Sequence, residues 1–329
     1  ADAVSGVINI ITRKDYDGIQ ANLLYGDTSN GGYQHGRVQG IIGNTTDTTN
    51  TLFTLEYWDN DEIKAKDRDY AASDVANPRG DYSIGGSSFI DYDTFQVNPD
   101  PNCGTPSDGI GGLGIPNSVV DVGLPGDQAW CGFNRTAYRQ LWADQEKISV
   151  SGRVDHDLTN ELTLFARAGY THKKTKTQLE PNFYGGSIFG YDSPGGVYPE
   201  GAWASVPPGA SNDPVPGSTS GGDFVRRLVE FGPRSSDIDE KIFNTVVGAK
   251  GTFMESDWEF GLSYSTIQLE SRSPNIIKSG LNSYINGSNG SLNLFEPIPE
   301  EVVNEVSYKQ KRDADSSNWT SDLVVTGDT

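Results

Sequence analysis

The chain has 329 residues, of which 35% are hydrophobic, and it combines 39 glycines with a single methionine and a formal net charge of -20. Such an acidic chain repels a phosphate backbone, which argues against nucleic acid as a partner. Few apolar residues and abundant glycine are typical of many strands joined by open loops rather than of a helical enzyme. No apolar run of about 18 residues occurs, so no transmembrane helix is predicted.

The chain opens on a short apolar segment. Residues 1–14 read ADAVSGVINIITRK, in which residues 7–11 predict a buried strand, Gly6 permits a close turn, and Arg13 and Lys14 mark the return to water. The first residues read as structured sequence rather than as the charged region and apolar core of a signal peptide. We therefore expect the chain to be a piece of a longer protein. The segment resembles the end of the plug domain of TonB-dependent receptors, which has a small-Asp-Ala-x-x-Gly-Val-Ile-Asn-Ile-x-Thr-basic pattern.

Segments that follow alternate apolar and polar residues, the period of a strand with two different faces. In an outer-membrane barrel the apolar set faces lipid and the polar set faces the lumen. We therefore expect Val150, Leu164, Ala166 and Leu262 to face lipid, and Ser151, Arg167 and Ser263 to face the lumen. The predicted strands are residues 19–26, 37–42, 53–58, 147–155, 162–171, 243–253, 258–265 and 322–326.

The connections between these segments alternate in length, except that residues 29–32 are short where a long connection is expected. Because successive antiparallel strands end at opposite rims, the short connections fall on one rim and the long ones on the other. This asymmetry is typical of outer-membrane barrels, with tight periplasmic turns and long extracellular loops. The short connections are residues 44–50, 157–160 and 255–257, and the long ones are residues 64–144, 178–239 and 272–317.

Aromatic residues stand near both predicted rims, as expected for belts at the two membrane interfaces. Those near the long-loop rim are Tyr25, Tyr57, Tyr170 and Tyr264, and those near the short turns are Phe53, Phe253 and Trp258.

Cys103 and Cys131 both lie in the first long connection, within a stretch rich in Gly, Pro and Asp. In an oxidising compartment this pattern predicts one disulfide-closed loop on the extracellular side. The two Cα atoms should then lie within about 7 Å of each other.

The resemblance to TonB-dependent receptors implies a division of the chain into two parts. Residues 1–15 would end the plug domain, and residues 16–329 would begin a transmembrane antiparallel β-barrel, supplying about 8 of about 22 strands. The family is located in the bacterial outer membrane, and its missing N-terminal region would couple transport to the TonB complex. Outer-membrane lipid and a small solute would be the other partners.

The expected function is the binding and import of a scarce, bulky solute such as a siderophore or an oligosaccharide. We expect no enzymatic activity and no cofactor, because the histidines are scattered and no nucleophile elbow is present. Aromatic residues in polar loops suit a ligand with apolar and hydroxyl faces. The predicted ligand contacts are Glu56, Trp58, Arg167 and Thr171 on the inner wall, and Tyr184 and Trp203 in the loops.

Some alternatives stay open at this point. A small closed outer-membrane barrel acting as an adhesin would pair the first and last strands, and a secreted carbohydrate-binding β protein would be soluble without detergent. Carboxylates at a loop base could hold calcium, although they lack an EF-hand pattern and a solvated rim explains them better. These acidic residues are Asp59, Asp61, Asp67 and Asp69.

Overall fold

The computed structural model describes most of the chain, and the predicted plug end at residues 1–15 lies outside the described residues. Trp203 also lies outside the described residues. The structure describes residues 16–29, 31–72, 83–84, 86–103, 118–124, 128–185, 205–215, 217–290 and 292–327.

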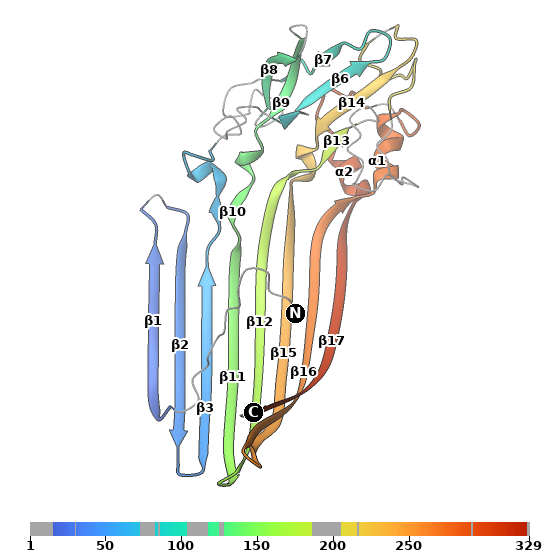
Figure 1. Cartoon of the computed structure of the whole chain (residues 1–329). Helices are drawn as coiled ribbons and strands as arrows, with labels where there is room; N and C mark the ends of the chain where they lie inside the picture. Colours follow the sequence, from blue (N-terminus) through green and yellow to red (C-terminus); the bar gives the residue numbers. More distant parts are fainter. Residues whose placement is uncertain are drawn as a thin grey trace.

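One large antiparallel sheet dominates the molecule (Figure 1). In the described part of the chain it has eight strands in the order β1-β2-β3-β11-β12-β15-β16-β17. All eight predicted segments are strands, and the all-β fold class is confirmed. The strands are β1 (Gly18–Asp27), β2 (Gln34–Thr45), β3 (Thr49–Asn60), β11 (Asp144–Thr159), β12 (Leu162–Pro181), β15 (Pro233–Phe253), β16 (Ser256–Ile276) and β17 (Ser307–Gly327).

The last four strands are longer than the alternation predicts. β17 has 21 residues, whereas the pattern predicts only residues 322–326. Its upper half is polar on both faces, so the hydrophobic period disappears while pairing with β16 continues from Ile276↔Ser307 to Ser256↔Gly327. The neighbouring strand, rather than a buried apolar face, specifies this part of the ladder.

Both edges of the sheet are open among the described residues, because β1 pairs only with β2 and β17 only with β16. The adhesin alternative requires pairing between the first and last strands, and the described residues show none. An open sheet is the expected form of a segment cut from a larger barrel.

The cross-strand register defines two faces of the sheet, since residues directly opposite each other share a face. Ala166 pairs with Val247, which pairs with Leu262, and this set defines the outer face. Arg167 pairs with Val246, which pairs with Ser263, and this set defines the inner face. Large apolar side chains on the outer face are exposed, including Ile19 at 79% and Leu323 at 65%.

Tight turns and long connections lie at opposite ends of the sheet (Figure 1). The turn at Met254 and Glu255 has positive φ at both residues, the backbone of a type I′ hairpin. The other tight turns are residues 46–48 and 160–161, and the long connections are residues 61–143, 182–232 and 277–306.

The long connections fold together into a compact loop domain, which the sequence pattern does not predict. Phe89, Tyr184, Phe224, Leu281 and Val306 from these connections are fully buried in a shared hydrophobic core. Cys131 belongs to a strand there, although its surroundings carry no strand periodicity.

None of the helices among the described residues is long and apolar enough to cross a bilayer.

The elements of the loop domain are short, which explains why no hydrophobic periodicity in the sequence predicts them. These elements are β4 (Ile63–Lys64), η1 (Ala65–Asp67), β5 (Ser83–Ile84), β6 (Ser87–Asp91), β7 (Val97–Pro99), β8 (Ser118–Leu124), β9 (Gln128–Phe133), η3 (Arg135–Ala137), β10 (Gln140–Trp142), β13 (Phe183–Gly185), β14 (Gly222–Arg227), η5 (Val229–Phe231), α1 (Lys278–Ile285) and α2 (Glu300–Val306).

Candidate functional site

The upper part of the inner face carries three of the predicted wall residues, Glu56, Trp58 and Thr171. Glu56 and Thr171 lie in one cross-strand row because both pair with Ser149 of β11. Glu56 accepts a hydrogen bond from Gln39 and lies 2.6 Å from the ammonium group of Lys147. The register and these contacts bring Glu56 and Thr171 into one polar row beside Trp58.

Trp58 stands one row nearer the loops and is held between cationic and aromatic neighbours. The guanidinium of Arg37 lies 5.9 Å from its ring centre, and His35 stacks on it at 5.9 Å. Its indole nitrogen donates to Asn60 Oδ1 at 2.8 Å. The ring is therefore fixed in place on the inner wall.

Arg167 does not share this row. It lies four residues below Thr171 on β12, roughly 13 Å along the strand. Its guanidinium sits 5.2 Å from the Phe165 ring, next to the ion pair in which Arg153 Nη2 donates to Asp155 Oδ1 at 2.7 Å. Arg167 thus lies deeper in the wall, separate from Glu56 and Thr171.

Tyr184 occupies a different environment from the wall residues. Its side chain is fully buried in the loop core, where it packs on Phe224 with ring centres 6.0 Å apart. Its hydroxyl lies 3.2 Å from Asn282 Oδ1 and donates to it. In this structure the ring supports the loop domain and is not on a surface that a ligand can reach.

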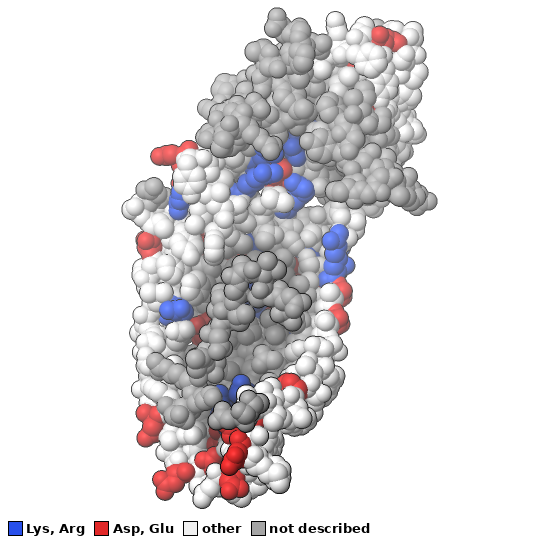
Figure 2. Space-filling view, viewed as in Figure 1, with Lys and Arg blue, Asp and Glu red and all other residues white. Residues whose placement is uncertain are grey.

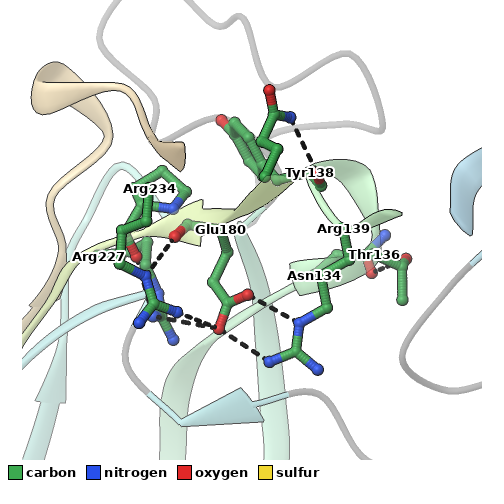
Figure 3. Close-up of polar contacts among 9 residues, drawn as sticks. Asn134, Thr136, Tyr138, Arg139, Glu180, Arg227 and Arg234 are labelled. Carbon is green, nitrogen blue, oxygen red and sulfur yellow. Dashed lines mark hydrogen bonds and ion pairs between the residues drawn. The ribbon is translucent and has the colours of Figure 1, made fainter. Parts of the chain in front are cut away.

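Basic side chains gather at the top of the strands, directly beneath the loop domain (Figure 2). Figure 3 shows their centre, where Arg139 lies on one side of the Glu180 carboxylate and Arg227 and Arg234 lie on the other. We call these four residues the arginine cluster. Sequence reasoning did not find it.

Every arginine of the cluster contacts Glu180. Arg139 donates from Nε to Oε2 at 2.7 Å and from Nη2 to Oε1 at 2.9 Å, a bidentate pair. Arg234 Nη2 lies 3.0 Å from Oε1, and Arg227 Nη1 lies 3.9 Å from the same oxygen. The carboxylate side chain is only 5% exposed, so it is enclosed by its cationic partners.

The ends of β12 and β15 place Glu180 at a break in the ladder. Pro181 pairs with Pro233, and the register shifts between Leu179 and Pro181. Proline cannot donate to the ladder, so regular pairing ends here. The backbone carbonyl of Glu180 instead accepts from Arg234 Nε at 2.9 Å.

Arg227 ends strand β14 of the loop domain and reaches down to the wall. Its Nη1 donates to the Pro181 carbonyl at 3.1 Å. Its guanidinium lies 5.2 Å from the ring centres of both Phe133 and Phe183, a cation–π arrangement on two rings. The cluster therefore joins two long connections to the top of the sheet.

Three guanidinium groups surround the carboxylate of Glu180. Burial is the largest influence on Arg227 and lowers its pKa to about 10; Glu180 opposes this shift, whereas Arg234, Arg135 and Arg139 add to it. Arg227 is still protonated at neutral pH. Only one sequence signal hints at the cluster, namely that Arg226, Arg227 and Arg234 fall within nine residues.

A disulfide joins Cys103 and Cys131, whose Cα atoms are 5.8 Å apart, inside the expected limit of about 7 Å. It lies in a long connection, on the loop side of the sheet. Cys131 is fully buried, and its backbone N–H donates to Ser88 Oγ at 3.0 Å. The bond fixes β9, which leads into Phe133 beside the arginine cluster.

The described residues also show whether a metal site is present. No three His, Cys, Asp or Glu side chains within them come together in a way that could hold a metal ion. The described residues include Asp59, Asp61, Asp67 and Asp69.

Comparison with known proteins finds similarity in structure. No model of a known protein family and no curated protein matches the chain. The structure is similar to that of the siderophore receptor PiuA from Acinetobacter baumannii, with 14% sequence identity and a TM-score of 0.31, over 94% of this chain and 36% of that chain. The chain thus spans little more than a third of that receptor, and so weak a likeness says nothing about its own ligand.

Proposed function

We propose that the chain forms part of the wall of an outer-membrane β-barrel receptor of the TonB-dependent type, which imports a scarce, bulky solute. The observation that carries the proposal is the exposed apolar outer face opposite a polar inner face. A soluble antiparallel sheet covers its apolar face with a second layer. No described residues form such a layer here, and Leu23, for example, is 80% exposed. Lipid is the partner that suits this surface.

The outer face also changes chemistry at a height that fits a membrane boundary. Tyr170 pairs with Phe243, whose ring centre is 6.5 Å from that of Tyr264, and Trp319 lies 4.5 Å beyond. Towards the loops this aromatic row gives way to charged residues such as Lys241. Aromatic rings at the interface, with charges beyond them, are typical of membrane barrels.

The length of the apolar band agrees with a bilayer. Phe243 and Phe253 are ten positions apart on β15. That separation is roughly 33 Å along a strand and about 25 Å of height at a tilt of ~40°, which matches the apolar band of outer-membrane barrels. Phe253 stands at the tight-turn end of the strand, and tight turns face the periplasm in outer-membrane barrels.

Import and coupling to the TonB complex rest on two further supports. One is the resemblance of residues 1–14 to the end of a plug domain. The other is the inner face, where Glu56, Trp58 and Thr171 line the side of the wall nearest the loops. A solute captured by the loop domain would meet these residues first and pass Arg167 deeper in the wall. Outer-membrane lipid surrounds the sheet in this proposal.

Cell fractionation tests the location. The full-length protein should sediment with outer membranes after expression in a Gram-negative host, resist extraction with urea, and dissolve only in detergent. A secreted carbohydrate-binding protein would instead be recovered in soluble form. Recovery of folded protein in the soluble fraction without detergent would contradict the proposal.

A further inference from the structure

We propose that Asn289 is a site of spontaneous covalent modification, at which the backbone nitrogen of Gly290 attacks the side-chain amide and converts the asparagine into aspartate and isoaspartate. This inference concerns the loop domain and goes beyond the proposed import function. The reaction meets least hindrance where glycine follows asparagine, because glycine has no Cβ beside the attacking nitrogen. The sequence contains three such pairs, at residues 30–31, 286–287 and 289–290.

The reaction needs only water as a co-reactant. The Gly290 nitrogen loses its proton to solvent and forms a bond to Cγ of Asn289. The bond from Cγ to Nδ2 breaks, and Nδ2 takes up a proton and leaves as ammonia, so that a cyclic succinimide remains. Water then opens the ring at one of its two carbonyls, which gives aspartate, or isoaspartate if the main chain continues through Cγ. Either product carries one more negative charge than asparagine.

The backbone N–H of the glycine distinguishes the three pairs. A nitrogen that donates a hydrogen bond is less free to lose its proton and to turn towards the side chain. Gly31 N donates to the Thr28 carbonyl at 3.0 Å. Gly287 N donates to the Tyr284 carbonyl at 3.3 Å. The N–H of Gly290 has no acceptor within the described ranges, so its nitrogen is available for the attack.

The side chain of Asn286 is held in place as well. Its Oδ1 accepts from the backbone N–H of Ser288 at 2.9 Å and from the Ser288 hydroxyl at 2.5 Å. Asn212 fixes the preceding turn, since its Nδ2 donates to the Ile285 carbonyl at 2.6 Å. These bonds must break before Cγ of Asn286 can meet the nitrogen of Gly287. The folded structure therefore protects Asn286.

Asn289 and Gly290 are exposed, so water and hydroxide ions reach the reacting atoms. Gly290 has a φ of 88°, and apart from its chain neighbours no heavy atom lies within 4 Å of the position that a Cβ would take there. The N–H of Asn289 donates to the Ser283 carbonyl at 2.8 Å, which anchors the residue on its N-terminal side only. The peptide unit between Asn289 and Gly290 therefore has room to rotate into the reactive geometry.

A carboxylate at position 289 would change the contact between α1 and α2. The Tyr284 hydroxyl of α1 donates to Glu305 Oε2 of α2 at 2.8 Å. This hydrogen bond is the largest cause of the raised pKa of Tyr284, and the neutral amide of Asn289 acts in the opposite direction. A negative charge in place of that amide would repel Glu305. The modification should therefore loosen α2 from α1.

The test is mass spectrometry of the full-length protein in detergent micelles, kept in mildly alkaline buffer made with water enriched in a heavy oxygen isotope. Water that opens the succinimide leaves the isotope in the new carboxylate, so conversion during later digestion in ordinary water is not counted. Fragmentation of the peptide that contains both pairs assigns the isotope to Asn286 or to Asn289.

A synthetic peptide of residues 283–293 is the matched control, because it is too short to keep the folded hydrogen bonds. Both pairs belong to the same sequence, Asn-Gly-Ser, in residues 286–288 and 289–291. We expect the preference for Asn289 over Asn286 to be about tenfold larger in the folded protein than in the peptide, the effect of one to two hydrogen bonds that must break at Asn286. The same preference in both, or faster labelling of Asn286 in the folded protein, would overturn the proposal.

Gly290→Ala tests the attacking atom, since the added methyl group hinders the nitrogen. Labelling at Asn289 should fall at least several-fold in this variant, while labelling at Asn286 should stay as in the wild type. Unchanged labelling at Asn289 would show that water hydrolyses the amide directly, which contradicts the proposed attack. If the variant does not fold, the comparison of folded protein and peptide still decides.

Asn289→Asp tests the effect on α2, with Asn289→Ala as the control that removes the amide without adding charge. Hydrogen exchange in residues 300–306 should be several-fold faster in Asn289→Asp than in Asn289→Ala. The difference should shrink as salt is raised, because screening weakens the repulsion of Glu305. Equal exchange in the two variants would overturn the predicted loosening of α2.

Discussion

Single residues on the two faces of the sheet follow the alternation in the sequence. The register places Leu262 with Val247 and Ser263 with Val246, on opposite faces as predicted. The arginine cluster is different, because Arg139, Glu180 and Arg234 meet only after two long connections fold. The two-residue alternation in the sequence predicts a strand and its two faces. It does not predict contacts between residues that are 40 or more positions apart.

Asp93 in the loop domain provides a test by pH at the scale of one residue. Its carboxylate accepts from Ser220 Oγ at 2.5 Å and from the backbone and side chain of Thr219, and these hydrogen bonds lower its pKa to about 2. In the unfolded chain the pKa of an aspartate is about 3.9. Because the pKa of Asp93 is lower in the folded chain, its ionised carboxylate stabilises the fold at pH values above about 3.9. The stabilisation is therefore complete at pH 6 and is lost as the pH falls towards 2.

The measurement is hydrogen exchange at the Thr219 amide, which donates to Asp93 Oδ2. Its protection, corrected for the intrinsic exchange rate, should fall between pH 4 and pH 2 in the wild type. Asp93→Asn should show weak protection with no such transition. An equal fall in both proteins would show that the titrating group lies elsewhere.

At the scale of elements, the strands were predictable and the loop domain was not. Each of the eight strands contains a stretch where an apolar outer face alternates with a polar inner one. β6, β9 and β14 are too short to show a period, and Phe89 and Phe224 are buried through contacts between different connections. Helices α1 and α2 pack against the same core. Tertiary packing rather than local pattern specifies these elements.

We expect the disulfide to hold β9 in place in the loop domain. Cys103 and Cys131 are separated by 28 positions, and closing such a loop stabilises by roughly 3.5 kcal/mol on the chain-entropy model. Cys131→Ser should make the segment around residues 128–133 sensitive to protease while the sheet stays resistant. Reduction of the wild type should reproduce the cleavage pattern, and identical resistance before and after reduction would contradict the prediction.

At the scale of the whole molecule, the open edges predict that residues 16–329 cannot insert alone. Among the described residues, β1 and β17 each have a neighbouring strand on one side of the sheet only. Each unsatisfied group costs several kcal/mol in hydrocarbon, so the edge rows outweigh the gain from burying the outer face. The isolated segment should aggregate in lipid vesicles, whereas the full-length protein inserts. Heat-modifiable, protease-resistant insertion of the segment as a monomer would show that the sheet can close by itself.

The central claim is that the outer face meets lipid and the inner face meets a polar lumen. Leu262 and Ser263 are adjacent on β16, near the middle of the apolar band, and point to opposite faces. The most direct test is the free energy of folding into bilayers of the full-length protein carrying Leu262→Arg or Ser263→Arg. We expect Leu262→Arg to cost about 2 to 4 kcal/mol and Ser263→Arg to cost close to nothing. Equal costs, or the larger cost at Ser263, would contradict the account.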